Sequence, residues 1–342
     1  MILVTGGTGL VGSHLLFKLV QKRHPVRAIY RTKEKIEMVK HVFSYYTENV
    51  DTLFSNIEWV EGDITDIPKL SEAFKGITHV YHCAAFISFD PHYYHSLRQI
   101  NIDGTANVVN LCISNKVEKL CYVSSIAAIG KELSNKLITE ESPWNKDEDH
   151  SVYAITKYGA EMEVWRGCQE GLDVVIVNPG VIIGPGFWRF GSGSFFKRIS
   201  KGLKYYTTGT TGYVSVNDVV NIMVLLMEGT IKNERYIVVA ENLTFKSFFT
   251  KIADALKVNP PKKEASSLLL QVAWRMDWLR SKIKGKHRRL VKHTVNTIQS
   301  VSNLDNSKII TDLGYEFISV DSSISSTSQH FLSDQYVFYL QI

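Results

Sequence analysis

The first twenty residues constrain the fold of this chain more than any other stretch. Residues 2–4 are apolar and partly β-branched, which predicts a short buried strand. Glycines follow at positions 6, 7, 9 and 12, and leucine and valine then recur at helical spacing over residues 13–20. Glycine lets the backbone approach a ligand closely, and a helix N-terminus offers free N–H groups to an anion. The stretch therefore predicts a dinucleotide diphosphate site, against the alternative of an ordinary tight strand–helix turn.

Similar strand-like runs alternate with helical segments over the first 180 residues. Further strands are predicted at 26–30, 57–60, 79–83, 120–124 and 174–177. Long helical periodicity covers residues 94–115 and 152–170. This alternation predicts the α/β class, with a doubly wound parallel sheet of the Rossmann type.

The pattern changes after Pro179, where glycine and aromatic residues dominate. With 342 residues, the chain can form one large domain or two closely joined ones. We predict a dinucleotide-binding domain from residues 1–180 and 211–232. Residues 181–210 and 233–342 are predicted to form a smaller, discontinuous substrate-binding domain.

The composition excludes several classes of protein. A net charge of +5 is mild and does not indicate nucleic-acid binding. The four cysteines form no CxxC pair, so we expect reduced thiols and no metal site. No run of about eighteen apolar residues is present to span a membrane. Because the first strand starts at Met1, no signal peptide is expected, and a cytoplasmic location follows.

A candidate acid–base centre lies in the middle of the chain. Tyr153 and Lys157 are four residues apart near the start of a predicted helix, so they share one face. A nearby ammonium stabilises a phenolate, so the pKa of Tyr153 is predicted to fall. Ser124 and Ser125 end a predicted strand at the edge where such sheets bind ligands. A surface helix pair and two turn-capping serines are the alternatives.

With these residues in place, the chain resembles the extended short-chain dehydrogenase/reductase family, within the NAD-dependent epimerase/dehydratase superfamily. The resemblance covers nearly the whole chain and rests on residues 6–12, 63–64, 82–85, 101–105, 124–125, 153 with 157, and 178–181. It implies that Tyr153 is the acid/base and that Lys157 holds the nicotinamide ribose. It further implies that Ser125 polarises the substrate oxygen, with Ser124 as the fallback, and that Asn101 supports the proton relay or the cofactor site.

The resemblance also implies a set of cofactor contacts. Asp63 and Ile64 should meet the adenine, Ala84 and Ala85 the diphosphate–ribose side, and residues 179–182 the nicotinamide. The full predicted set is Gly6, Thr8, Gly9, Leu10, Val11, Gly12, Tyr30, Arg31, Lys35, Asp63, Ile64, Ala84, Ala85, Ser124, Tyr153, Lys157, Pro179, Gly180, Val181 and Ile182.

The end of the second strand indicates which cofactor is used. An acid there would bind a ribose 2′-hydroxyl and repel a 2′-phosphate. This chain has Tyr30 and Arg31 instead, with Lys33 and Lys35 close behind. The pattern predicts NADP(H), with NAD(H) as the other candidate if these are only solvated surface cations.

Within the family, residues 178–186, 209–218 and 312–315 most resemble the dihydroflavonol-4-reductase-like branch, which neighbours 3β-hydroxysteroid dehydrogenases. Sugar-nucleotide epimerases usually carry an arginine where this chain has Gly212, which weakens that alternative. Dehydratases place an acidic pair after the strand-end hydroxyl residue, whereas Ile126 and Ala127 stand here.

Aromatic residues at 86–89 and 187–190 predict an apolar pocket, with Phe86, Ser88, Ser125 and Trp188 as substrate-binding residues. Packing of an interdomain core is the alternative. The predicted reaction is hydride transfer between NADPH and a ketone or aldehyde, or the reverse. The alternatives are a nucleotide-sugar epimerase and a non-catalytic cofactor-binding sensor or scaffold. The complete set of serine, tyrosine and lysine disfavours the sensor or scaffold.

Two stretches lie outside this prediction. Residues 268–279 are apolar and run into a basic segment at 280–292. This pattern indicates either a weak peripheral membrane contact or a domain helix with a solvated basic face. For the apolar tail at 336–342, the sequence leaves three alternatives: a last strand, a subunit contact or disorder. By resemblance only, a homodimer would form through residues 94–115 and 152–170.

Overall fold

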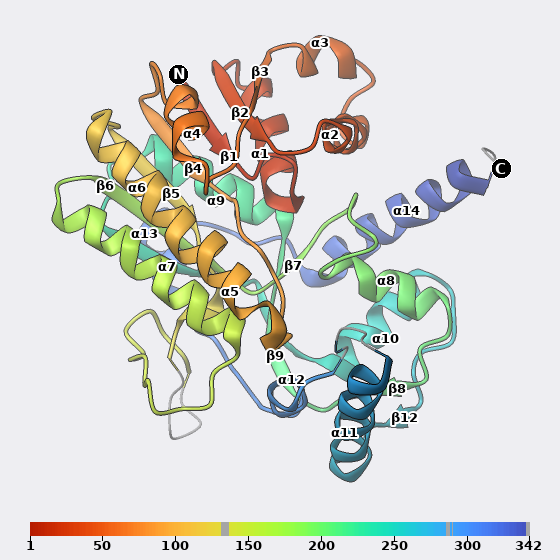
Figure 1. The fold of residues 1–342 in the computed structure, drawn as a ribbon. Coiled ribbons are helices and arrows are strands. Elements are labelled where there is room, and N and C mark those ends of the chain that lie inside the picture. The colour runs from red at the N-terminus through yellow and green to blue at the C-terminus, as the bar shows by residue number, and fades with distance from the viewer. Residues whose placement is uncertain (131–136, 285–287, 289, 340–342) are drawn as a thin grey trace.

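The computed structural model describes residues 1–130, 137–284, 288 and 290–339. Its centre is a seven-stranded parallel sheet in the order β10-β6-β5-β4-β1-β2-β3 (Figure 1). The strands are β1 (Ile2–Thr5), β2 (Val26–Tyr30), β3 (Ile57–Glu61), β4 (His79–His82), β5 (Lys119–Val123), β6 (Asp173–Pro179) and β10 (Glu234–Val238). The predicted α/β class and Rossmann-like sheet are confirmed. The order reverses between β1 and β4, and a crevice at such a switch point is where these sheets bind ligands.

Helices cover both faces of this sheet (Figure 1). One face packs against α1 (Leu10–Gln21), α2 (Glu34–Ser44), α3 (Val50–Phe54), α9 (Val216–Glu228) and α13 (Ser307–Leu313). The other face packs against α4 (Ile67–Ala73), α6 (Gly104–Ser114) and α7 (Val152–Gln169). Strands β1 and β6 are buried along nearly their whole length because both faces of the sheet are covered, as is usual for a parallel sheet.

The predicted helical stretch at 94–115 is helical but not uniform. It begins with α5 (Tyr94–Leu97), passes through a π-helical segment, η2 (Arg98–Asp103), and continues as α6. Single π-helical turns are rare and often mark functional positions. Here the turn carries Asn101, which is buried.

A smaller region packs beside the carboxyl ends of the sheet. It contains a three-stranded sheet of β7 (Val181–Ile183), β9 (Thr210–Ser215) and β11 (Glu241–Thr244), and a strand pair of β8 (Tyr205–Tyr206) and β12 (Lys263–Glu264). Its helices are α8 (Gly193–Ser200), α10 (Phe245–Ala255), α11 (Ser267–Lys284), α12 (Lys292–Thr297) and α14 (Val320–Tyr339). Aromatic side chains dominate its core, with Phe196, Tyr213, Phe248 and Phe331 all buried.

Two details differ from the sequence predictions. Strand β10 lies in residues assigned to the substrate region, yet it pairs in parallel with β6 and extends the main sheet. Conversely, β9 starts at Thr210 and pairs with β7 and β11 rather than with the main sheet. The local sequence of a short strand does not show which sheet the strand joins. Only its pairing with distant strands assigns it to a sheet.

The C-terminal segment ends as a helix. Helix α14 runs to Tyr339, so the described part of the tail at 336–342 is not a strand, and residues 340–342 lie outside the described residues. The four cysteines are free thiols, as predicted. Within the described ranges, no helix is long and apolar enough to cross a bilayer.

Candidate active site

The turn after β1 is shaped for close contact with a ligand. Gly6 has φ +68°, and a Cβ atom there would lie 2.5 Å from the backbone nitrogen of Ala84. A Cβ atom on Gly12 would collide with the carbonyl of Gly6. Helix α1 begins after Gly9 without a side-chain cap, so its first N–H groups have no intrahelical partner. This cradle fits the diphosphate of a dinucleotide.

The predicted diphosphate contacts meet at this turn. Residues 6–12 form it, and Ala84 and Ala85 follow β4, the neighbour of β1. The N–H of Ala84 donates to Oγ1 of Thr5 at 3.4 Å, which fixes the strand ends relative to each other.

The predicted adenine edge is formed by the ends of β2 and β3. Tyr30 ends β2 and Arg31 follows it, and a guanidinium nitrogen of Arg31 lies 3.4 Å from Oδ2 of Asp63. The Arg31 side chain is 56% exposed, and Lys35 is also exposed. Ile64 differs, because its side chain is buried in the core and only its backbone is left for a ligand.

The catalytic candidates converge at the other side of the crevice. Tyr153 lies in the first turn of α7, and the side chain of Ser125 acts on its hydroxyl to lower the pKa of Tyr153. The Ser125 hydroxyl also accepts the N–H of Ala127 at 3.1 Å, which caps a short 3₁₀ turn, η3 (Ile126–Ala128). The ring of Phe89 meets that of Tyr153 edge-on, with centroids 5.5 Å apart.

The protonation states differ from the sequence prediction. Lys157 is buried, and its ammonium donates to the Tyr122 hydroxyl at 2.6 Å and to the Val123 carbonyl at 2.8 Å. Burial lowers the pKa of Lys157 to about 7. Burial raises the pKa of Tyr153 to about 12, against the lowering effect of the Ser125 side chain. The predicted fall in the tyrosine pKa is therefore wrong for this structure, because Lys157 is held by β5 and desolvation dominates.

Asn101 links two sides of the site through hydrogen bonds. Its amide oxygen accepts the Phe86 N–H at 2.7 Å, and its amide nitrogen donates to the Phe86 carbonyl at 3.0 Å. The same nitrogen donates to Oγ1 of Thr156 at 3.1 Å. Asn101 thus joins the loop of Phe86 to the helix that carries Tyr153.

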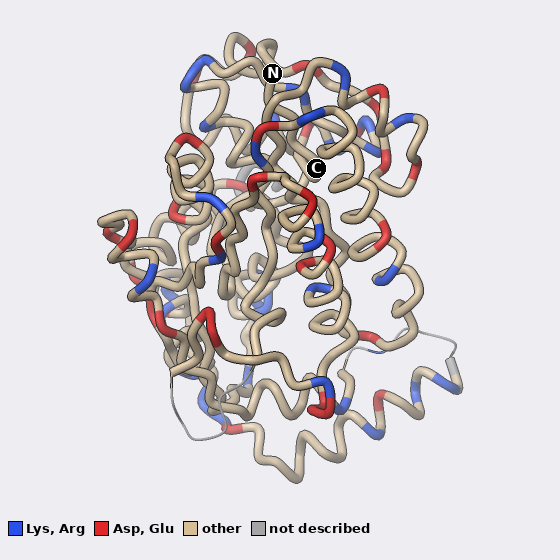
Figure 2. Tube along the Cα trace, turned by 90° about the vertical axis from the view of Figure 1, so that its left-hand side faces the viewer, with Lys and Arg blue, Asp and Glu red and all other residues tan. Residues whose placement is uncertain are grey.

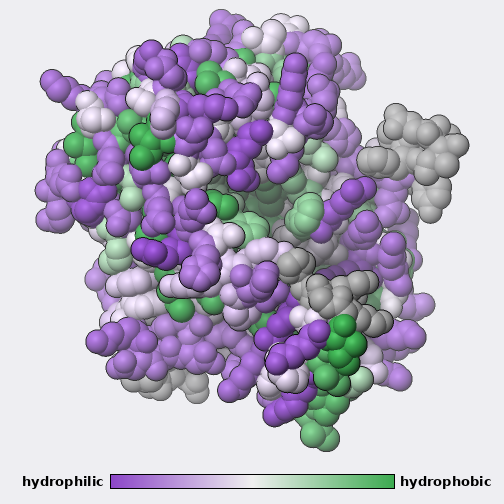
Figure 3. All heavy atoms as spheres, viewed as in Figure 1, coloured by the Kyte–Doolittle hydropathy of each residue, from purple (hydrophilic) through white to green (hydrophobic). Residues whose placement is uncertain are grey.

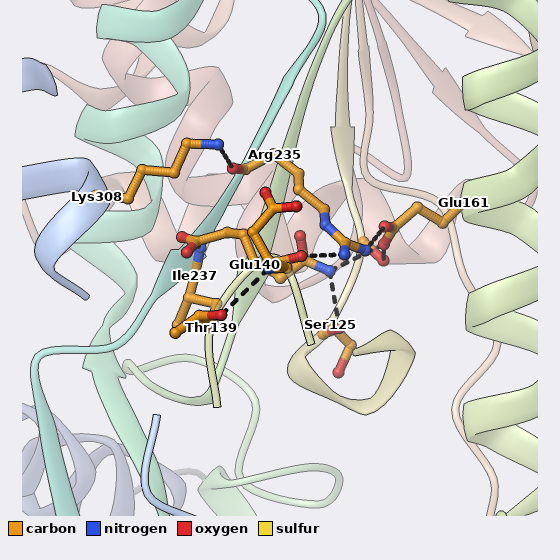
Figure 4. Close-up of polar contacts among 10 residues, drawn as sticks. Ser125, Thr139, Glu140, Glu161, Arg235, Ile237 and Lys308 are labelled. Carbon is orange, nitrogen blue, oxygen red and sulfur yellow. Dashed lines mark hydrogen bonds and ion pairs between the residues drawn. The ribbon is translucent and has the colours of Figure 1, made fainter. Parts of the chain in front are cut away.

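Sequence reasoning missed a buried ion pair behind the serines. The carboxylate of Glu161 accepts the Ser124 hydroxyl at 2.6 Å and the Asn178 amide at 2.9 Å, and it pairs with Arg235 at 3.0 Å (Figure 4). Arg235 also donates to the carbonyl of Glu140. Ser124 is therefore turned toward Glu161, which favours Ser125 as the serine available to substrate.

A signal for Glu161 was present in the sequence. It lies four residues after Lys157 and eight after Tyr153, so all three fall near one face of α7. Nothing comparable marked Arg235, which comes from a strand 74 residues further on.

The predicted substrate residues separate into two groups. Phe86 and Ser88 lie in the loop that also carries Phe89, beside Tyr153. Trp188 instead donates to the Asp334 carboxylate at 2.6 Å and packs edge-on against Phe331, with centroids 5.1 Å apart. Its contacts support the alternative of core packing, because they tie the segment at 187–190 to α14.

Residues 179–182 end β6 and form most of β7, at the carboxyl edge of the sheet. They lie next to Asn178, whose amide also donates to the Ser125 carbonyl at 3.0 Å. The predicted nicotinamide border and the predicted catalytic serine are thus joined by a single side chain.

Comparison with known families decides the class. The model described as the NAD dependent epimerase/dehydratase family matches residues 2–240. This chain belongs to that family. Its members are NAD(P)-dependent enzymes, so the sensor or scaffold alternative gives way to that of an enzyme.

Several relatives of this family member match over most of their length. The putative dihydroflavonol 4-reductase of Synechocystis sp. is 26% identical over 98% of this chain and 95% of its own. Sterol demethylase protein B of Methylococcus capsulatus is 27% identical over 91% and 92%. Among solved structures, UDP-glucose 4-epimerase of Thermotoga maritima with UDP-glucose has a TM-score of 0.76 at 22% identity, covering 98% and 99%, which shows the shared fold.

Proposed function

We propose that this protein is a reductase that transfers hydride from NADPH to a ketone or aldehyde of an apolar compound, or catalyses the reverse. The observation that carries the proposal is the arrangement of Tyr153, in the first turn of α7, and Ser125, just after β5, on the sheet that carries the dinucleotide cradle. The two curated relatives named above, a putative dihydroflavonol 4-reductase and a sterol demethylase protein, support a bulky apolar substrate.

The residues of the chain suit this chemistry. A reduced nicotinamide cofactor, when bound, supplies the hydride. Tyr153 and Ser125 are placed to donate hydrogen bonds to one carbonyl oxygen, and Tyr153 can then release its proton to the alkoxide. Because the pKa of Tyr153 is about 12, the phenol holds this proton at neutral pH, which is the form that reduction requires.

The surroundings of Tyr153 favour apolar compounds over sugar nucleotides. The adjacent loop exposes Ile87 and Phe89 to solvent, and apolar walls of this kind suit an apolar ligand. At Gly212, a Cβ atom would lie 2.5 Å from a methyl group of Val239. With this close packing, position 212 offers no cation to a substrate diphosphate, which disfavours the epimerase alternative.

Purified protein with NADPH should reduce at least one member of a panel of aromatic and alicyclic ketones and aldehydes. The same protein with UDP- and dTDP-sugars should show no epimerisation. The assay follows NADPH absorbance for the first panel and product chromatography for the second. Turnover of the sugar nucleotides alone would refute the reductase proposal.

We also propose a preference for NADP(H), because exposed Arg31 and Lys35 follow the end of β2 and no acid stands there to repel a 2′-phosphate. Replacing both by alanine should weaken NADPH binding by about tenfold or more and change NADH binding little, since each cation contributes a charge-assisted contact. Fluorescence titration with both cofactors measures this, with Lys75→Ala near the start of β4, at the opposite edge of the sheet, as the control. Equal or tighter NADH binding by the unmodified protein would contradict the preference.

A further inference from the structure

Helix α11 turns its apolar side chains toward solvent. Leu268 is 76% exposed, Met276 66% and Ile283 73%, and Val272 and Leu279 are exposed as well. Their spacing of four, four, three and four residues places all five on one helix face. We call these five residues the apolar stripe. Figure 3 shows it as a continuous hydrophobic surface at the position of α11 in Figure 1.

The opposite face of α11 is held against the protein through polar groups. The Asp277 carboxylate accepts the N–H of Leu290 at 3.0 Å and pairs with Arg280 at 2.6 Å. Leu270 is buried. Beyond the helix, the N–H of Arg288 donates to Asp90 at 3.0 Å. A surface helix normally buries its apolar face and exposes its polar one. Here a second apolar face, the stripe, is exposed to solvent, which marks a surface suited to a partner.

The charge around the stripe identifies the kind of partner. From position 275 to its end at 284, α11 contains four lysine or arginine residues and one acid, Asp277. Figure 2 shows α11 along the lower edge of the molecule, with cationic positions toward its end. Lys282 lies over the ring of Trp278, 4.6 Å from its centroid, at the border of the stripe. Apolar residues flanked by cations and tryptophan are the pattern of helices that lie in a lipid interface.

We propose that α11 binds the surface of an anionic lipid bilayer. The apolar stripe would lie at the boundary between headgroups and acyl chains, and the cations of α11 would meet the anionic headgroups. A second copy of the chain could also cover an apolar stripe. The excess of cations favours the bilayer, because two copies facing each other would bring like charges together.

The full-length protein should co-sediment with vesicles of phosphatidylcholine containing about 30% phosphatidylglycerol, where each basic residue near the surface adds attraction. Binding should be about tenfold weaker or more to pure phosphatidylcholine, and weaker again at about 0.5 M salt, where charges are screened. Lys282→Gln should weaken binding to the anionic vesicles about fivefold and leave binding to neutral ones unchanged.

The double variant Leu268→Gln with Ile283→Gln should lose about tenfold or more of the anionic-vesicle binding, because both side chains are among the most exposed of the stripe. Ile67→Gln, an exposed apolar residue on α4, is the matched control and should bind like the unmodified protein. Circular dichroism and cofactor binding check that each variant folds.

Absence of binding to anionic vesicles at low salt would overturn the proposal, and so would unchanged binding by the double variant. Sedimentation analysis tests the alternative of a dimer. If the protein formed a dimer that the double variant abolished, and bound no vesicles, the stripe would be assigned to a second copy and the bilayer proposal would be overturned. These outcomes are independent of the proposed reductase activity, which is measured with soluble substrates.

Discussion

Replacing Tyr153 by phenylalanine should lower kcat for carbonyl reduction by about 10²- to 10⁴-fold, the range that a positioned general acid contributes. Phenylalanine keeps the ring that packs against Phe89 and removes only the hydroxyl. Cofactor affinity and folding should therefore change little. Steady-state kinetics at saturating NADPH, together with a cofactor titration, separate the loss of the proton donor from a loss of binding.

Tyr158→Phe provides a matched control on the same helix. Tyr158 stacks on Trp144 with ring centroids 4.4 Å apart, so it lies in a different contact from Tyr153. Its variant should keep nearly full activity. If Tyr153→Phe kept full activity as well, the acid–base role of Tyr153 would be rejected.

Replacing Arg235 by methionine should lower the free energy of unfolding by about 3–5 kcal/mol, the usual cost of leaving a buried charge without its partner. The Glu161 side chain is fully buried, and Arg235 supplies its counter-charge at 3.0 Å. Asn178 donates to both Glu161 and the Ser125 carbonyl, so the same variant should also lower kcat through a displaced Ser125. Chemical denaturation and steady-state kinetics measure the two effects.

Two further variants make the Arg235 result specific. Arg166→Met removes the pairs of Arg166 with Glu163 and Glu170, which lie at the surface, and should cost less than about 1 kcal/mol. Adding Glu161→Gln to Arg235→Met removes the uncompensated charge and should restore part of the lost stability. An Arg235→Met variant that is no less stable than Arg166→Met would show that the ion pair carries no structural role.

The sequence by itself determined the features that depend on near neighbours. The glycine turn could be predicted because this strand–turn–helix unit brings backbone atoms close together at Gly6 and Gly12, where a side chain would collide. The placement of Tyr153 at a helix start and of Ser125 after a strand followed from local pattern, and the alternation of strands and helices predicted the parallel sheet. These patterns are local, so they can be read without knowing what packs around them.

Only the tertiary structure decided the features that depend on distant partners. Glu161 pairs with Arg235, which is 74 residues away in the sequence, and Trp188 donates to Asp334, which is 146 residues away. The pKa of Tyr153 rises because of burial that no spacing reveals. The outward direction of the α11 stripe is of the same kind, since a helical pattern shows which residues share a face but not which face meets solvent. In each case, the surroundings of the side chain depend on three-dimensional packing between distant segments and not on the local sequence.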